Sequence, residues 1–510
     1  MNPLLLLRTA ARLNLPPAAL ARLAAAVRKY GVNLMALLAF AAETYGERPA
    51  LVDERESYSF RRLHAEADRL AALLIGRYGL APGRKAAVWC RNHAGLVKAI
   101  YAVSATGADL YLLNADLSGE QAARLAAGAK FDLLVHDEEK RGPAERIIRD
   151  GMRRVGEQAL DAGGGSPAAA DRRAPRLRRT SAGRLILLTG GTTTGLGKEA
   201  PHRPSLSVYL APFYAFVSRL NVPARRAAYI AVPLCHGYGL AALLALCAAG
   251  RTAIIRRGFD AEQACRLIRA HRAEMAVVVP TMLQRMLRTD PDALVSLSCI
   301  ASGGAELGPR LVRETHERLG PVLYNLYGTS EAGLALIAAP EDLAAAPNTV
   351  GRPIPGVRLR VAGPDGKDLG AGRVGRLQVG RRGARRLGAN AWIDTGDLGY
   401  RDGRGRYFLC GRADSMIVSG GENVYPLEVE QVLLTHPAIE DAAVIGVVDE
   451  TFGMRLKAFV QPVRPGAVTE GELRTWLNGK LARYQMPRDI VFVERLPYTP
   501  LGKLDRKTLR

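Results

Sequence analysis

The segment LILLTGGTTTGLGKEAPH, residues 185–202, places a loop of phosphate-binding residue types directly after an apolar stretch typical of a strand. Glycines let a backbone approach an anion closely, and threonines offer hydroxyl and amide donors. A lysine near the end of the loop adds a positive charge. The residues concerned are Thr189, Gly190, Gly191, Thr192, Thr193, Thr194, Gly195 and Lys198. The segment therefore predicts a phosphate-binding loop, with a ligand-free surface turn as the alternative.

This loop is not a P-loop of the Walker type. That motif requires a glycine five residues before its Gly-Lys pair and a Ser or Thr after the lysine. Thr192 stands at the glycine position here, and Glu199 stands at the Ser/Thr position. Because the charge of Glu199 would repel a triphosphate, a different kind of phosphate loop is expected.

The segment PLCHGYGL, residues 233–240, places a thiol beside an imidazole. Such a pair can form a nucleophile and its base when the two side chains face each other. Neighbouring residues of a strand point to opposite faces of a sheet, so a strand here would separate Cys235 from His236. We therefore do not expect a Cys–His nucleophile.

Composition favours an ordinary soluble enzyme with more than one domain. The chain has 510 residues, of which 48% are hydrophobic and 24% charged, enough to bury large cores. Its formal net charge of +22 comes mainly from arginines scattered through an Ala- and Gly-rich chain, and no nucleic-acid-binding motif accompanies it. The six cysteines lie far apart without metal or disulfide spacing. We expect reduced, buried thiols, a cytoplasmic protein and no nucleic-acid partner.

The first 42 residues contain basic side chains and no acidic one. Arginines and prolines interrupt the apolar runs, so none is long enough to cross a bilayer, and the LLLL run is too short for a secretion signal. The helical spacing of Leu13, Leu20, Leu23 and Val27 fits two interpretations. One is a peripheral helix at the inner face of a membrane. The other, which we favour, is a helix packed on the body of the protein.

Strand-like and helix-like segments alternate over much of the chain. KAAVWC (85–90) precedes the helical pattern of 95–108, and RAAYIAVPL (226–234) precedes that of 239–250. Further strand-like runs begin near residues 131, 252, 275 and 298. This alternation predicts parallel sheets covered by helices. Residues 161–184 are expected to form an exposed linker, and short strands with glycine turns from about residue 350 predict a small β-rich subdomain.

A compact unit is expected from about Asp414 onward. Strand patterns at 442–449, 456–463 and 490–497 surround helical patterns at 426–436 and 470–481. The predicted fold class is therefore α/β. Residues 1–413 would form a large N-terminal domain of helix-covered parallel sheets plus the small β-rich subdomain. Residues 414–510 would form a small mobile α+β lid domain.

Taken in order, several segments resemble the signature segments of the adenylate-forming superfamily. This superfamily includes acyl-CoA synthetases, firefly luciferase and nonribosomal peptide adenylation domains. The resemblance extends from about residue 40 to the end of the chain. It is carried by TGGTT with GLGK, PLCHGYGL, ASGGAEL, NLYGTSEAG, WIDTGDLGYRDGRGRYFLCGRADSMIVSGGENVYPLEVE and PYTPLGKLDRKTLR. It implies that the opening loop holds the β- and γ-phosphates of ATP, although Thr194 is an extra residue and Gly197 replaces the usual proline.

The resemblance implies roles for individual residues in nucleotide binding. A flat wall for adenine would be formed by Gly303, Gly304 and Ala305, with Tyr327 stacked on the ring. Asp397 would accept hydrogen bonds from the ribose hydroxyls, and Arg412 would contact ribose or phosphate. Glu331 would hold Mg²⁺. The same nucleotide-binding segment also contains Gly328, Thr329 and Ser330, the last replacing the usual threonine.

The resemblance also implies how the carboxylate and CoA would be handled. His236 would guard the carboxylate pocket, and Lys503 would bridge the carboxylate and the α-phosphate as pyrophosphate leaves. Asp414 would be the hinge about which the lid rotates after adenylation. The passage for the CoA thiol would then be lined by Gly420, Gly421 and Glu422.

The implied function is an ATP-dependent acyl-CoA synthetase that uses ATP, Mg²⁺ and coenzyme A. A fatty acid is the expected carboxylate, because YGLAALLALCAAG (238–250) suggests an apolar pocket lined by small residues. An aryl-carboxylate CoA ligase and an adenylating protein that loads a carrier protein are the alternatives. From a different class, a non-catalytic nucleotide-binding protein is the third.

Overall fold

The chain forms two compact units. The computed structural model describes residues 3–13, 15–148, 152–161, 177, 179–187, 206–329, 332–381, 392–419, 422–449, 453–478, 480–499, 504–506 and 508–509. The first unit comprises Met1–Val277 and Asp292–Ser298, and the second comprises Val278–Pro291 and Cys299–Arg510. The expected boundary between residues 413 and 414 does not coincide with this division and stays a prediction.

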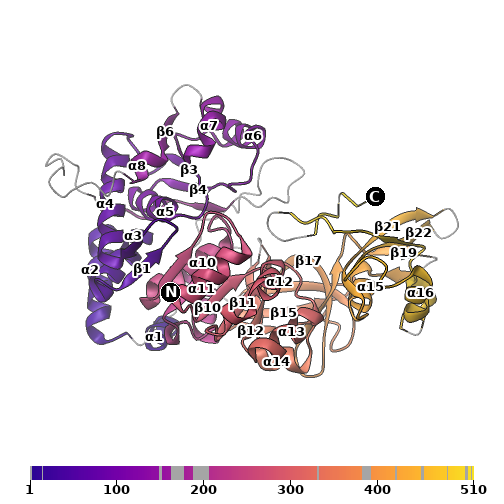
Figure 1. The fold of residues 1–510 in the computed structure, drawn as a ribbon. Coiled ribbons are helices and arrows are strands. Elements are labelled where there is room, and N and C mark those ends of the chain that lie inside the picture. Colours follow the sequence, from indigo (N-terminus) through magenta and orange to yellow (C-terminus); the bar gives the residue numbers. More distant parts are fainter. Residues whose placement is uncertain are drawn as a thin grey trace. The chain divides into compact units, whose positions relative to one another are not determined.

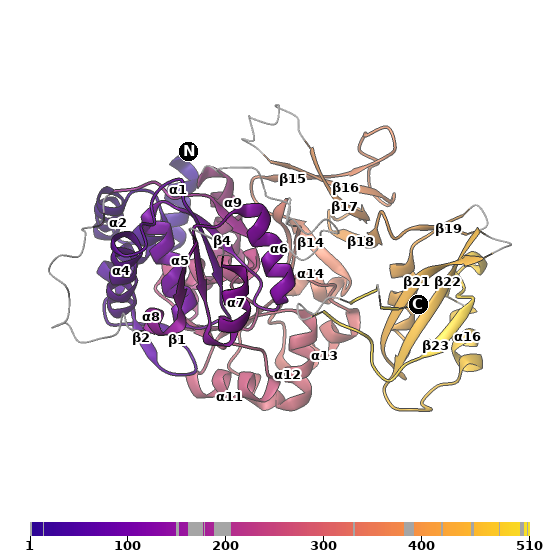
Figure 2. The same ribbon diagram turned by 90° about the horizontal axis from the view of Figure 1, so that it is seen from above.

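One sheet of the first unit is entirely parallel in its described strands. Its order is β6 (Arg153–Gly156), β5 (Leu133–His136), β3 (Lys85–Trp89), β4 (Asp109–Leu112) and β7 (Leu185–Leu187). Helix α5 (Ala94–Thr106) lies on the opposite side of this sheet from α6 (Gly119–Ala129) and α7 (Arg141–Ile147), as Figure 2 shows. Apolar residues of α6 and α7 pack against Trp89 and Tyr111 of the sheet. The predicted alternation of strands and helices is confirmed here.

A second group of strands in this unit runs in the order β10 (Met275–Val278), β8 (Ala227–Ile230), β9 (Thr252–Ile255) and β1 (Pro49–Val52). These strands are parallel, and β2 (Ser57–Ser59) pairs antiparallel to β1. The helices that follow or accompany them are α3 (Leu34–Tyr45), α4 (Phe60–Gly76), α10 (Gly237–Ala249) and α11 (Ala261–His271). Most residues of α10 are buried, which agrees with its apolar sequence.

The N-terminal helices pack on the first unit itself. Helix α1 (Pro3–Arg12) contacts α9 (Leu206–Arg219), and α2 (Pro17–Tyr30) contacts α3. Among the described residues, no helix is both long enough and apolar enough to cross a membrane. The end of the predicted linker is also attached, because the Thr180 amide donates to the Tyr30 carbonyl (2.9 Å) and that of Ala182 to Val32 (3.1 Å). Residues 162–176 and 178 of that linker lie outside the described part.

The second unit contains a mainly antiparallel run of strands. Its order is β15 (Val357–Ala362), β16 (Gly375–Arg381), β17 (Trp392–Arg401), β18 (Tyr407–Arg412), β14 (Thr349–Pro353), β13 (Gly333–Ala338), β12 (Leu323–Thr329) and β11 (Cys299–Gly303). Only β11 and β12 are parallel among these described pairs. The associated helices are α12 (Pro280–Thr289), α13 (Pro309–Leu319) and α14 (Pro340–Ala345). Strands β15 to β18 correspond to the predicted β-rich subdomain.

The C-terminal part of the second unit has its own sheet. Strands β20 (Glu422–Val424), β19 (Ile417–Ser419), β22 (Gly453–Pro462) and β21 (Ile439–Asp449) are neighbours in that order, and β23 (Asp489–Phe492) pairs with β22. Helices α15 (Pro426–Leu433) and α16 (Glu470–Asn478) accompany these strands (Figure 1). The predicted α/β fold class is confirmed, with parallel sheets in the N-terminal part and a small α+β domain at the C-terminus.

Candidate nucleotide-binding site

Three predicted site residues meet in the second unit, although they are far apart in sequence. Asp397 on β17 and Arg412 on β18 are register partners in adjacent strands. The hydroxyl of Tyr327, on β12, donates to Asp397 Oδ2 at 2.5 Å. Arg412 Nη1 donates to Asp397 Oδ1 at 3.3 Å. Since each carboxylate oxygen has two lone pairs, Asp397 retains acceptor capacity for ribose hydroxyls.

A tight turn of β17 fixes the direction of the Asp397 side chain. Thr395 Oγ1 donates to the Leu377 carbonyl (2.9 Å) and accepts from the Asp397 amide (3.2 Å). Gly396 has a φ of +77°, and a Cβ built there would lie 2.6 Å from both terminal nitrogens of Arg412. The Arg412 guanidinium therefore lies against the backbone of Gly396. Any larger residue at position 396 would occupy the space that the guanidinium fills.

Opposing effects act on the pKa of the Asp397 carboxyl. Burial raises it, while the hydrogen bond from Tyr327 and the charge of Arg412 lower it; burial prevails, so the pKa lies above its usual range. Burial and the neighbouring Asp397 also raise the pKa of Tyr327, which keeps its phenol protonated as a donor. Tyr327 and Arg412 therefore favour the ionised carboxylate that a ribose hydroxyl would need.

The predicted adenine wall lies beside Tyr327. Gly303 at the end of β11 is the register partner of Leu326 on β12, so the turn after β11 is next to Tyr327. Gly304 has a φ of +81°, and the nearest atom to a Cβ built there is a Val279 methyl at 3.7 Å. The carboxyl ends of parallel strands are the usual place for a nucleotide in open sheets. Tyr327, Asp397 and Arg412 thus meet directly, and Gly303, followed by Gly304 and Ala305, ends the strand next to Tyr327.

Local packing and hydrogen bonding explain the residue types of Gly328 and Thr329. A Cβ on Gly328 would lie 2.6 Å from the Gly333 carbonyl oxygen across the β12–β13 pair, so no side chain fits. Thr329 Oγ1 accepts the Ala332 amide at 3.1 Å and shapes the turn between the strands. Ser330 and Glu331 in this turn lie outside the described residues, so the predicted magnesium ligand stays a prediction.

The segment around His236 is a turn in the first unit, so the expectation of a strand there was wrong. Strand β8 ends at Ile230, and His236 is the N-cap residue of α10. The side chain of Asn92 holds this turn through the Val232 carbonyl (3.0 Å) and the Leu234 amide (2.8 Å). Burial raises the pKa of Cys235 to about 12, which leaves it a thiol at neutral pH. Burial of the thiol, rather than strand geometry, therefore argues against a nucleophilic Cys235.

Of the other predicted site residues, the structure describes some and not others. Asp414 is exposed and accepts from Arg412 Nε at 3.3 Å. Glu422 is exposed at the start of β20. Outside the described residues lie the whole phosphate loop (Thr189 to Lys198), Gly420, Gly421 and Lys503. The roles given to these residues stay predictions.

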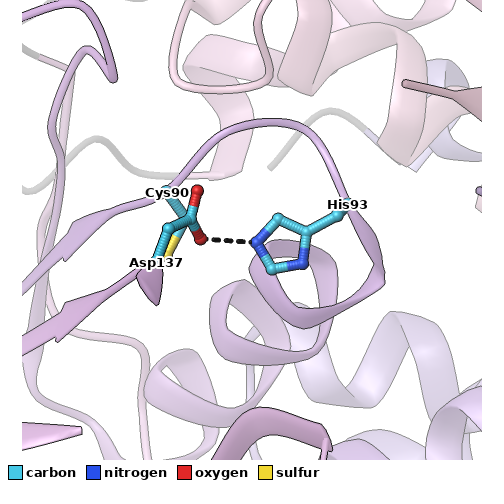
Figure 3. A group of neighbouring side chains, drawn as sticks. All are labelled: Cys90, His93 and Asp137. Atoms are coloured by element: carbon cyan, nitrogen blue, oxygen red, sulfur yellow. Dashed lines mark hydrogen bonds and ion pairs between the residues drawn. The ribbon is translucent and has the colours of Figure 1, made fainter. Parts of the chain in front are cut away.

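A further group of side chains, of types that can bind a metal ion, lies in the first unit, between β3, β5 and α5. Cys90, His93 and Asp137 are buried and face one another (Figure 3). Their ligand-type atoms lie within 4.8 Å of one another, as in a metal site. His93 Nε2 and Asp137 Oδ1 are 2.7 Å apart, and the Gly95 amide donates to His93 Nδ1 at 3.1 Å.

The hydrogen bonds of this cluster argue against a metal ion. Because Nδ1 accepts from Gly95, Nε2 must carry the proton and donate it to Asp137, which leaves neither ring nitrogen for a metal. Burial and Asp137 raise the pKa of the Cys90 thiol, and the Arg257 guanidinium already lies 3.5 Å from Asp137 Oδ2. The cluster therefore fits a structural role, in which it fixes the start of α5.

Comparison with known families identifies the chain. Residues 38–385 match the AMP-binding enzyme family model, and residues 428–503 match the model of the AMP-binding enzyme C-terminal domain. The chain belongs to the AMP-binding enzyme family. It is a member of the adenylate-forming superfamily, as the sequence motifs predicted.

Curated relatives and solved structures support this assignment. Indoleacetate–CoA ligase of Aromatoleum aromaticum is 35% identical over 51% of this chain and 54% of its own length, so that match spans only about half of each. 2-Succinylbenzoate–CoA ligase of Bacillus subtilis is 28% identical over 92% and 96% of the two chains. The fatty acid–[acyl-carrier-protein] ligase ScoC of Streptomyces coeruleorubidus is 28% identical over 94% and 96%. The structure of o-succinylbenzoate CoA synthetase from Bacillus subtilis with its acyl-adenylate has a TM-score of 0.79 at 27% identity, over 93% and 97%.

Proposed function

We propose that this protein is an AMP-forming acid–CoA ligase whose carboxylic acid carries a ring. The hydrogen-bonded group of Tyr327, Asp397 and Arg412, next to the end of β11, supports the nucleotide part of this proposal. In this proposal Tyr327 would stack on adenine and Asp397 would accept from the ribose, with the Arg412 cation beside that carboxylate. The names of the relatives support the choice of acid, because indoleacetate and 2-succinylbenzoate both contain rings.

Two steps make up the proposed reaction. A carboxylate oxygen of the acid attacks the α-phosphorus of ATP, and pyrophosphate leaves to give acyl-AMP. The sulfur of CoA then attacks the acyl carbon, AMP leaves, and the thiol proton passes to solvent. Lys503 would stabilise the charge that develops in the first step, and Asp397 would hold the ribose through both.

A fatty acid, the substrate expected from the sequence, remains the second candidate. The buried, apolar α10 and the fatty acid–carrier ligase among the relatives favour it. That relative also keeps transfer to a carrier protein as an alternative second step. Non-catalytic nucleotide binding is the remaining alternative.

Pyrophosphate exchange into ATP tests the proposal. The purified full chain would be given indole-3-acetate, 2-succinylbenzoate, benzoate and saturated fatty acids of several lengths. We expect exchange with a ring-bearing acid and faster AMP release when CoA is added. Exchange only with fatty acids would replace the substrate assignment, and exchange without CoA-stimulated AMP release would favour a carrier-loading enzyme. No exchange with any acid would favour the non-catalytic alternative. Lys503→Ala serves as the control, since loss of one transition-state contact costs roughly 3 kcal/mol, about a hundredfold in rate.

A further inference from the structure

The last residues of the chain cover one face of the C-terminal sheet. Val444 and Val460 pack with α15 and α16 in one cluster of buried residues. Their neighbours Ala443 and Phe459 pack instead with Leu496 and Leu509. Because successive strand residues point to opposite faces, the two helices cover one face, and Leu496 and Leu509 of the C-terminal segment pack on the other.

In this C-terminal segment, residues 496–509, the described residues before and after Lys503 pair with one another. Tyr498 and Leu504 form an antiparallel bridge. The Asp505 amide donates to the Pro497 carbonyl at 2.9 Å. Lys503 itself lies outside the described residues, but both described legs of its loop are held together at the base. The position of the base limits where the lysine can reach.

Each leg is attached to a carboxylate of the same domain, to buried Glu430 on one side and to half-buried Asp441 on the other. On the second leg, Arg506 Nη2 lies 2.7 and 2.6 Å from the two oxygens of Glu430 on α15. On the first leg, the Tyr498 hydroxyl donates to Asp441 Oδ2 at 2.5 Å. Glu430 is only 5% exposed and also accepts the Val444 amide at 2.6 Å. The carboxylate is therefore fixed to both α15 and β21.

Loss of the Arg506 guanidinium would leave a buried carboxylate without its cation, which is a costly arrangement. The ion pair joins residues 76 positions apart in sequence, and the arginine comes three residues after Lys503. The pair therefore ties the loop of the predicted catalytic lysine to the folded core of the domain. The Arg506 side chain is 38% exposed, so the buried partner that fixes the pair is Glu430, which the Val444 amide also holds.

We propose that Arg506 is a positioning residue for the adenylation step, which it serves by tying the loop of Lys503 to Glu430. This inference rests on the proposed function, in which Lys503 contacts the reacting carboxylate and phosphate. Arg506 does not contact the substrate; it restricts where the Lys503 ammonium can lie. Preorganised charge of this kind loses its effect when its support is loosened.

The kinetic test uses Arg506→Met and Glu430→Gln in the full chain. Each variant should lower kcat of pyrophosphate exchange at least tenfold and change KM for ATP little. The rate of thioester formation from supplied acyl-AMP should stay within about twofold of wild type. Because both act on one pair, the double variant should be no worse than the poorer single variant. Arg506→Lys keeps the charge and should recover part of the rate. Glu470→Gln, which breaks the exposed Arg474–Glu470 pair, is the matched control and should stay within twofold.

Hydrogen exchange of the free protein provides a readout that does not depend on activity. The amides of Asp505 and Thr508 are bonded within the segment, to Pro497 and Asp505 respectively. Arg506→Met should speed their exchange, and Glu470→Gln should not. The proposal is overturned if both half-reactions fall equally, if adenylation is unchanged, or if exchange of this segment is unaffected. Absence of pyrophosphate exchange in the wild-type protein would refute the proposed function instead, and hydrogen exchange would still decide whether Arg506 holds the segment.

Discussion

Asp397 shows how distant segments of the chain can hold a single carboxylate. It is held from two sides, by the Tyr327 phenol on β12 and the Arg412 guanidinium on β18. Burial nevertheless raises the pKa of Asp397 above its usual range. The native state therefore binds this proton more tightly than the unfolded state, and the contribution of Asp397 to stability falls as the pH rises through its native pKa. The ionised form needed for ribose is correspondingly lost at a higher pH than for an ordinary aspartate.

This argument predicts that part of the pH dependence of the affinity for AMP is lost in Asp397→Asn. Wild-type affinity should weaken as the pH is lowered from 8 towards the raised pKa, because the protonated carboxyl accepts more poorly. The variant should bind about ten- to a hundredfold more weakly at pH 8, as expected for loss of hydrogen bonds to a charged group. Calorimetric titration with AMP at several pH values measures both effects. Asp365→Asn, at an exposed site, is the control; equal pH slopes in wild type and Asp397→Asn would contradict the assignment.

At the scale of elements, the β17 turn depends on a glycine that leaves room for Arg412. Gly396→Ala would place a methyl group 2.6 Å from the guanidinium nitrogens at a φ of +77°. We expect a loss of stability of about 1 kcal/mol or more from the backbone strain and a roughly tenfold weaker AMP affinity from displacement of Arg412. Gly403→Ala is the control, since nothing lies within 4 Å of a Cβ there. Unchanged AMP binding in Gly396→Ala would show that Arg412 does not contribute.

The start of α5 provides a second prediction for an element. Burial alone would raise the pKa of Asp137, but the hydrogen bonds that the carboxylate accepts from His93 and from the Arg91 amide outweigh it, so the pKa lies below its usual range. Ionised Asp137 therefore stabilises the folded state above the ordinary aspartate pKa of about 3.9. This stabilisation is lost as the pH falls through the pKa of Asp137 in the folded protein. Asp137→Asn should lower the free energy of unfolding by about 2 to 3 kcal/mol at neutral pH, because its amide would oppose the donors that surround it.

Urea unfolding at pH 7 and at lower pH measures this loss. Asp116→Asn, which weakens a more exposed pair with Arg91, should change stability by less than about 1 kcal/mol. A cobalt titration of the wild-type protein adds a separate check on the cluster. Thiolate-to-cobalt absorption from Cys90 would contradict the structural role assigned here.

At the scale of the whole molecule, a hinge at Asp414 predicts that the two half-reactions can be separated. Asp414 is exposed, so its replacement does not disturb a core. Asp414→Pro would restrict the backbone at this position. Adenylation should persist, while thioester formation from acyl-AMP should slow at least tenfold. Asp414→Ala removes the same contact with Arg412 without stiffening the chain. In single-turnover measurements it therefore separates loss of this contact from loss of backbone flexibility. Equal slowing of both half-reactions by the proline would contradict a hinge at this residue.

Much of the architecture could be predicted because it depends on local patterns. The strands β3, β5, β8 and β10 and the helices between them follow from apolar runs and helical spacing. The C-terminal domain is equally local, since its strands and helices match the predicted segments closely. The motifs around Tyr327, Asp397 and Arg412 were sufficient to predict a nucleotide site and its family.

Tertiary structure alone decided how these residues support one another. The Tyr327–Asp397 bond spans 70 residues, and the Arg506–Glu430 pair spans 76. Neither spacing follows a helical or strand period, so no local pattern predicts which donor meets which acceptor. The same holds for Asn92, which fixes the turn before His236 from 142 residues away.

The error at Cys235 has the same origin. An apolar run predicts a strand but not the residue at which it ends, and β8 stops at Ile230. The sequence by itself determined the elements, the family and the residue types of the site, because these depend on neighbouring residues. Pairing, burial and the resulting pKa shifts depend on contacts between distant segments, which exist only once the chain has folded.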